Sequence, residues 1–166
     1  MRVLGIDPGL QVCGYALMEA EGGRETLVEA GVVRTSVEAA LEERLDQIAR
    51  DMQTLLDRFG PAVVAVEELY SHYAHPRTAI LMGHARGVIL QKCAEAGVGV
   101  RSYSATRIKK SVTGNGRASK EQVQRTVQTI LALPEPPEPN DVADAIAVAL
   151  CCANSMTRAS LEAAGR

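Results

Sequence analysis

The sequence has 166 residues, a length that predicts a single domain with one hydrophobic core. Hydrophobic residues make up 46% and aromatic residues only 3%, with no Trp, so the core must be built from Val, Leu, Ile and Ala. The net charge of −2 does not by itself indicate a nucleic-acid-binding protein, no apolar run approaches membrane-spanning length, and the four cysteines contain no C-x-x-C pair, so we expect a cytoplasmic protein.

The first half of the chain predicts a three-stranded meander followed by a helix and a buried strand. Residues 3–6, 12–18 and 26–35 are short apolar runs, separated by turn signals at 7–9 and 21–24. From Ser36 to Phe59 the apolar residues recur at helical spacing, and we expect Ser36 to be the N-cap. Residues 62–66 form a continuous apolar run, which predicts a strand buried on both faces.

The second half predicts more helix than strand. A helix from 76 to about 96, a strand over 98–103 and helices over 105–112 and 119–131 precede a proline-rich connector. Asn140 then caps a last helix that ends near Met156. The order βββαβαβ followed by helices predicts one α/β domain over 1–157, a mixed sheet with helices on its faces, and a loose tail over 158–166.

Carboxylates follow two of the predicted strands and begin the last helix. Asp7 closes the first strand, and Glu67 comes directly after the apolar run of the fourth. If those strands are parallel neighbours, both acids lie at the sheet edge where sites form in α/β folds. Asp141 and Asp144 are spaced i, i+3, on one face of a helical turn. Each acid alone has an ordinary explanation as a turn former, a strand end or a helix cap, but together they indicate one site.

Four converging carboxylates repel one another, which raises their pKa values unless cations join them. Mg²⁺ prefers carboxylate oxygens and keeps water ligands for a substrate phosphate. Two such ions, about 4 Å apart, activate a water and stabilise the leaving oxygen in phosphodiester cleavage. The acids therefore predict a metal-dependent phosphodiesterase in which the same four residues are catalytic and metal-binding.

Positive charge is concentrated between Arg101 and Arg125. This segment has seven basic residues and one acid, a net charge of +6, so the remainder of the chain carries −8. A basic segment on an otherwise acidic protein can mark a polyanion-binding surface, although a solvated helix face explains the charge equally well.

Five motifs in this sequence resemble those of the RuvC-type Holliday junction resolvases, in the same order and over nearly the whole chain. They are GIDPG with Gly14-Tyr15, AVEE, GHARGV (83–88), IKKSVTGNGRASKEQV (108–123) and DVADAIAVA (141–149). The resemblance implies a ribonuclease H-like fold with sheet order 3-2-1-4-5, strand 2 antiparallel and helices on both faces.

The resemblance also implies an activity and partners. It implies a Mg²⁺-dependent crossover junction endodeoxyribonuclease of DNA recombination and repair, with two ions per site and Mn²⁺ able to substitute. The enzyme would be a homodimer that resolves four-way junctions by paired symmetric nicks, leaving 5′-phosphate and 3′-hydroxyl ends, with a branch-migration motor complex as a partner.

The family's site residues map onto this sequence at matching positions. Its four acids fall on the four carboxylates named above. An aromatic residue that stacks on DNA bases falls on Tyr70, and two lysines that hold phosphates fall on Lys109 and Lys120. Further positive charge for DNA comes from Arg107, Lys110 and Arg117. The helix that contains Gly83 and Gly87 has a thin surface and would take part in the dimer contact.

Three alternatives remain open on the sequence. An actin-like ATPase or sugar kinase shares the GIDPG opening but needs two such domains and a second phosphate loop. A non-catalytic junction-binding protein would gain by losing negative charge at its DNA-binding face. A ribonuclease H acting on RNA–DNA hybrids would share the metal site, and the basic segment with its TGNG loop favours the junction enzyme over it.

Overall fold

The computed structural model describes residues 1–69 and 76–164, which form five strands and five helices. The strands are β1 (Arg2–Asp7), β2 (Val12–Glu21), β3 (Arg24–Arg34), β4 (Val63–Glu67) and β5 (Gly99–Tyr103). The helices are α1 (Leu41–Phe59), α2 (Pro76–Glu95), α3 (Ala105–Thr113), α4 (Lys120–Ile130) and α5 (Asn140–Ala164).

All five strands belong to one mixed sheet in the order β3-β2-β1-β4-β5. The strand β2 pairs antiparallel with both β1 and β3, whereas β1, β4 and β5 run parallel. This is the predicted order, and strand 2 is the antiparallel one, as expected. Because β1 and β4 are parallel neighbours, their carboxyl ends lie at the same edge of the sheet.

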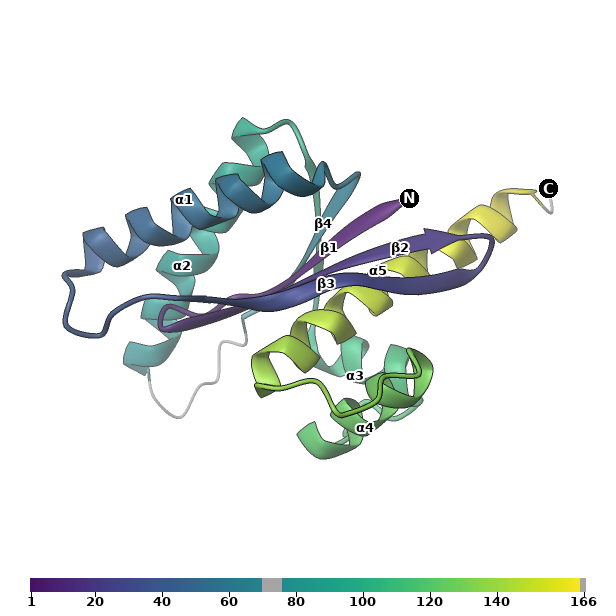
Figure 1. Ribbon diagram of the computed structural model, residues 1–166. Helices are drawn as coiled ribbons and strands as arrows, with labels where there is room; N and C mark the ends of the chain where they lie inside the picture. Colours follow the sequence, from purple (N-terminus) through teal and green to yellow (C-terminus); the bar gives the residue numbers. More distant parts are fainter. Residues whose placement is uncertain (70–75, 165–166) are drawn as a thin grey trace.

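The helices cover both faces of the sheet, as predicted (Figure 1). The pair α1 and α2 lies on one face, and α3, α4 and α5 lie on the other. Successive side chains of a strand point to opposite faces of the sheet. Because helices cover both faces, both sets of side chains are apolar and the apolar runs are continuous. In β4, Val63 and Ala65 face α5 while Val64 and Val66 face α1 and α2.

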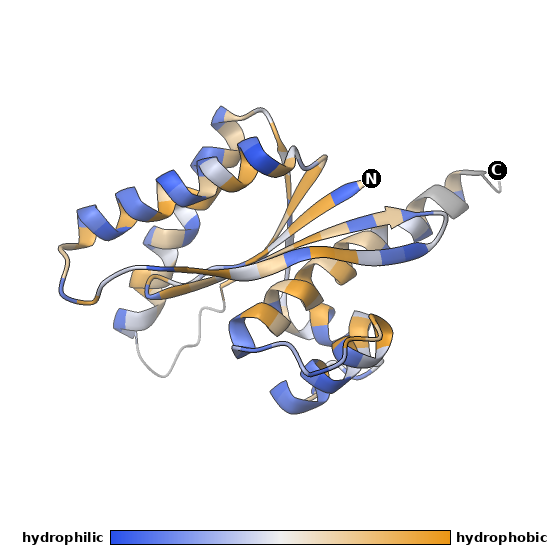
Figure 2. Cartoon of the chain, viewed as in Figure 1, coloured by the Kyte–Doolittle hydropathy of each residue, from blue (hydrophilic) through white to orange (hydrophobic). Residues whose placement is uncertain are grey.

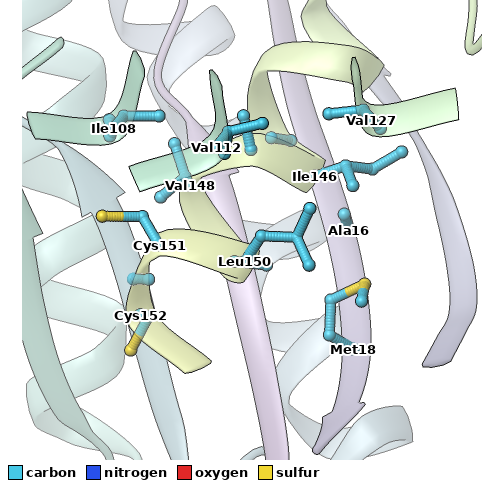
Figure 3. Close-up of a cluster of buried hydrophobic side chains, with 14 of the residues drawn as sticks. Ala16, Met18, Ile108, Val112, Val127, Ile146, Val148, Leu150, Cys151 and Cys152 are labelled. Carbon is cyan, nitrogen blue, oxygen red and sulfur yellow. The ribbon is translucent and has the colours of Figure 1, made fainter. Parts of the chain in front are cut away.

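The core between the sheet and α5 is made of small and branched aliphatic residues. Ile146, Val148 and Leu150 of α5 pack with side chains of β2, α3 and α4 (Figure 3). The hydropathy colouring shows α5 mostly apolar in its middle, after a hydrophilic start, and α1 apolar on one side only (Figure 2). All four cysteines are free and buried in the two cores, as their sequence pattern indicated.

Two helix boundaries differ from the sequence prediction. The helix α1 begins at Leu41 rather than after Ser36, whose hydroxyl instead accepts a hydrogen bond from the Glu38 N–H at 3.2 Å in a turn. The carboxylate of Glu43 accepts a bond from the Ala40 N–H at 3.1 Å, which caps the true start.

The helix α5 continues to Ala164, past the point where a loose tail was predicted. Residues 157–164 contain neither Gly nor Pro, so no residue in this stretch interrupts the helix. None of the helices in the described ranges is apolar over enough residues to cross a bilayer.

Candidate active site

The strands β1 and β4 place two carboxylates side by side. Asp7 is the last residue of β1 and Glu67 the last of β4, and the parallel pairing of Ile6 with Val66 puts them at equivalent positions. The prediction that these strands are parallel neighbours is therefore confirmed. Glu67, rather than Glu68, contributes a negative charge that acts on Asp7.

The first turn of α5 brings the other two acids to the same edge because glycines let the helix lie directly on the strands. Gly14 pairs with Asp7 across β1 and β2, and a Cβ built on Gly14 would lie 2.0 Å from the Asp141 carbonyl oxygen. A Cβ on Gly5 would lie 2.3 Å from the carbonyl oxygen of Ala145. No side chain fits at either position, so these glycines fix where Asp141 and Asp144 lie.

The electrostatics show that the other acids act on Asp7 and that Asp144 acts on Glu67. Burial raises the pKa of Asp7 from 3.8 to about 8, and the charges of the other three acids add to the rise. Burial, followed by the charge of Asp144, raises the pKa of Glu67 to about 7. The cluster is therefore short of positive charge.

Two lysines supply part of that charge. The Lys120 ammonium donates a hydrogen bond to Asp144 Oδ2 at 3.0 Å. Partial burial alone would lower the pKa of Lys120, but the bond to Asp144 and the surrounding carboxylates outweigh it, so the pKa is raised. The charge of Lys109 opposes the rise in the pKa of Glu67, as does Lys120. Both predicted lysines thus lie close enough to act on the carboxylates.

The donor set suits a hard divalent cation. Every ligating atom offered by Asp7, Glu67, Asp141 and Asp144 is a carboxylate oxygen, and the raised pKa values show that the cluster gains from added positive charge. As they stand, no three His, Cys, Asp or Glu side chains within residues 1–69 and 76–164 are gathered around one point. The residues therefore fit Mg²⁺ in chemistry and charge, with side-chain adjustment needed to enclose it.

Arg86 of α2 supports the end of β4. Its Nε donates a hydrogen bond to the Glu67 carbonyl oxygen at 3.2 Å, and its Nη2 donates to Ser102 Oγ of β5 at 2.8 Å. The guanidinium therefore ties the strand that carries Glu67 to its neighbour. The sequence analysis assigned no role to Arg86, Gly5 or Gly14. All three fall within the quoted motifs, and their roles become visible only once the strands are paired.

The remaining predicted DNA-binding residues do not gather at the carboxylates. Arg107 stacks on the Tyr103 ring, with 4.9 Å from its guanidinium carbon to the ring centre, and Arg107 and Lys110 line a separate cavity at the other end of α5. Arg117 is exposed in the turn between α3 and α4, where its N–H donates to Asn115 Oδ1. Tyr70 lies outside the described residues.

Comparison with known proteins identifies the family. The model of the family "Crossover junction endodeoxyribonuclease RuvC" matches residues 3–152. The protein of that name from Rhodopirellula baltica is 51% identical over 149 residues, which cover 90% of this chain and 84% of the relative. The one from Heliobacterium modesticaldum is 46% identical over 157 residues, covering 95% and 96% of the two chains.

Solved structures agree with the sequence comparison. The RuvC structure from Thermus thermophilus has a TM-score of 0.88 and 37% identity, covering 96% of this chain and 97% of that one. The same protein in complex with a Holliday junction substrate has a TM-score of 0.86 and 35% identity, covering 95% and 96%. The ribonuclease H-like fold that the motifs implied is confirmed, and the chain belongs to the RuvC family of crossover junction endodeoxyribonucleases.

Proposed function

We propose that this protein resolves four-way DNA junctions by making paired symmetric nicks, using Mg²⁺ held by Asp7, Glu67, Asp141 and Asp144. The observation that carries the proposal is that Glu67, Asp141 and Asp144 lie near enough to Asp7, at the carboxyl edge of β1 and β4, for their charges to help burial raise its pKa to about 8. The structure of the Thermus thermophilus relative with a Holliday junction supports the choice of substrate.

Each part of the site has a role in this reaction. When bound, two Mg²⁺ ions would supply the positive charge that activates water and stabilises the leaving oxygen, giving 5′-phosphate and 3′-hydroxyl ends. Asp7, whose pKa is raised by burial and by the charges of the other three acids, would be one of the residues that hold the ions. Lys109 and Lys120 would hold the scissile phosphate beside the carboxylates. Mn²⁺, which takes the same oxygen ligands, would substitute.

The test is the substitution Asp7→Asn, assayed on a synthetic four-way junction, a linear duplex and an RNA–DNA hybrid with Mg²⁺, with Mn²⁺ and without metal. We expect the parent protein to cut the junction in preference to the other two substrates and only with metal. Asp7→Asn should bind the junction but lose cleavage by at least about a thousandfold. Cleavage by Asp7→Asn at the parent rate would refute the site, and preferential cleavage of the hybrid would refute the substrate.

We also propose that the protein acts as a homodimer through α2, because paired nicks need two active sites. The exposed face of α2 includes Ile80, Gly83 and Gly87, and Ile80 is 61% exposed. A Cβ on Gly87 would meet nothing within 4 Å, so packing inside one described chain does not require glycine there. A second helix lying across this face would require it. A branch-migration motor complex that remodels the same junctions would be the partner of the dimer.

A further inference from the structure

An open cavity lies away from the four carboxylates, at the other end of α5. It has a volume of about 690 Å³ and is lined by residues of α3, of the C-terminal half of α5 and of the turn between β2 and β3. Figure 1 shows that turn beside the last turns of α5, far from the start of the helix. We call it the α3–α5 cavity. The residues used below are Arg107, Lys110, Ser111, Asn154, Ser155 and Arg158.

The lining of the α3–α5 cavity is cationic and rich in hydrogen-bond donors. Three cations, Arg107, Lys110 and Arg158, face a single carboxylate of the described lining, Glu25. Among the ion pairs formed by residues 1–69 and 76–164, none involves any of the three cations. The surplus positive charge is therefore available to a ligand.

Neutral donors complete this lining. Arg107 Nη2 donates to Ser155 Oγ at 3.3 Å, and Asn154 Nδ2 donates to Ser111 Oγ at 3.4 Å. These bonds join lining residues of α3 to lining residues of α5 and hold two hydroxyls beside the cations. Guanidinium, ammonium and hydroxyl groups around one space are the groups that bind phosphate oxygens.

The cavity and the carboxylate site lie on opposite flanks of α3. At 100° per residue, Lys109 points to one side of the helix and Arg107 and Ser111 to the other, with Ile108 and Val112 buried between them. Lys109 acts on Glu67, whereas Arg107 and Ser111 line the cavity. Along α5, Asp144 and Ser155 are eleven residues apart, about 16 Å at 1.5 Å per residue. A duplex of about five base pairs spans that length at 3.4 Å per pair.

We propose that the α3–α5 cavity is a second phosphate-binding site, which takes the backbone of a junction arm while another phosphate lies at the carboxylates. The inference rests on the proposed function and adds to it a contact about five base pairs from the cut. Positive charge then runs from Lys109 and Lys120 across α3 to Arg158, so the basic segment and the end of α5 form one DNA-binding surface.

The experiment measures junction binding in the Asp7→Asn background, so that no substrate is cut. The affinity for a fluorescent four-way junction is titrated between low and moderate salt for Asp7→Asn alone and combined with Arg158→Ala, Arg158→Lys or Arg50→Ala. Arg50 is the matched control, an exposed arginine on α1 at the opposite face of the sheet. Circular dichroism melting confirms that each variant is folded.

Arg158→Ala should weaken binding by about three- to tenfold and reduce the slope of log K against log salt by about 1, since one phosphate contact is lost. Arg158→Lys should restore the slope, and Arg50→Ala should change neither quantity. An unchanged affinity and slope in Arg158→Ala, beside an Asp7→Asn protein that binds well, would overturn this inference alone. So would weaker binding with an unchanged slope, because the lost contact would not be a phosphate. Failure of Asp7→Asn itself to bind junctions would overturn the proposed function and this inference with it.

Discussion

At the scale of single residues, the main electrostatic feature of the site is the raised pKa of Asp7. Its carboxyl is partly buried beside three other acids, and this burial and their charges raise its pKa from 3.8 to about 8. Glu67 shifts in the same direction, to about 7. Between pH 4 and 8 the folded protein therefore holds protons that the unfolded chain has released, so stability falls as pH rises through that window.

Asp7→Asn should therefore stabilise the metal-free protein at pH 8, by an amount on the order of a few kcal/mol, and should have little effect near pH 4. The asparagine removes the charge that the fold has to accommodate and keeps the shape of the side chain. Urea unfolding in EDTA at several pH values measures the difference. Adding Mg²⁺ should raise the stability of the parent more than that of Asp7→Asn, because only the parent keeps all four ligands. A difference between the two proteins that does not change with pH would contradict this account.

At the scale of elements, the close approach of α5 to β1 and β2 brings Asp141 and Asp144 near Asp7. The approach depends on Gly5 and Gly14, where a Cβ would overlap the helix backbone. Because Gly14 pairs with Asp7, any shift of the helix here moves Asp141 relative to Asp7 directly.

Gly14→Ala should lower cleavage of a junction by about a hundredfold or more, since a displacement of about 1 Å at a reacting centre has an effect of that size. Stability should fall by about 1–3 kcal/mol through overpacking. The matched control is Gly99→Ala in β5, where a Cβ would meet nothing within 4 Å and the glycine has no positive φ. Single-turnover cleavage and thermal melting compare the two variants. Equal effects of both substitutions would show that the contact with α5 does not position the acids.

The sequence predicted the elements that depend on local pattern and missed those that depend on packing. The sheet order came from the resemblance to the RuvC-type family, not from the residue pattern. The period of apolar residues was sufficient to predict the strands and to put Asp7 and Glu67 at strand ends, because strands buried on both faces are continuous apolar runs. The apolar pattern could not place the start of α1. Ser36 and Ala40 are both possible N-cap positions, and the hydrogen bond from the Ala40 N–H to the Glu43 carboxylate is found at the actual start. The pattern could not assign Gly14 or Arg86 either, because their roles exist only between elements that are distant along the chain.

At the scale of the whole molecule, two nicks require two sites, and α2 offers a face for a second copy. Replacing Gly87 with Arg would place a long charged side chain where the helix of the proposed second copy would approach closely. The substitution leaves the monomer intact, because an arginine in an exposed helix favours the helix over glycine by about 0.5–1 kcal/mol.

Gly87→Arg should shift the protein from dimer to monomer in sedimentation and convert paired nicks into single, uncoordinated nicks. Thr54→Arg is the matched control, because Thr54 is exposed on α1, which covers the same face of the sheet. If the Gly87→Arg protein dissociates into monomers over the same concentration range as the parent, the dimer contact lies elsewhere.

The helix α5 contacts every strand of the sheet and both neighbouring helices on its face. Its central residues, from Ala145 to Ala153, are all buried. Opening this helix would expose the larger of the two cores, so it cannot melt as a local fluctuation while the rest of the domain stays folded. The acids on its first turn are therefore carried by an element whose opening requires the whole domain to unfold. We expect the proposed metal site and the native state to be lost in a single transition.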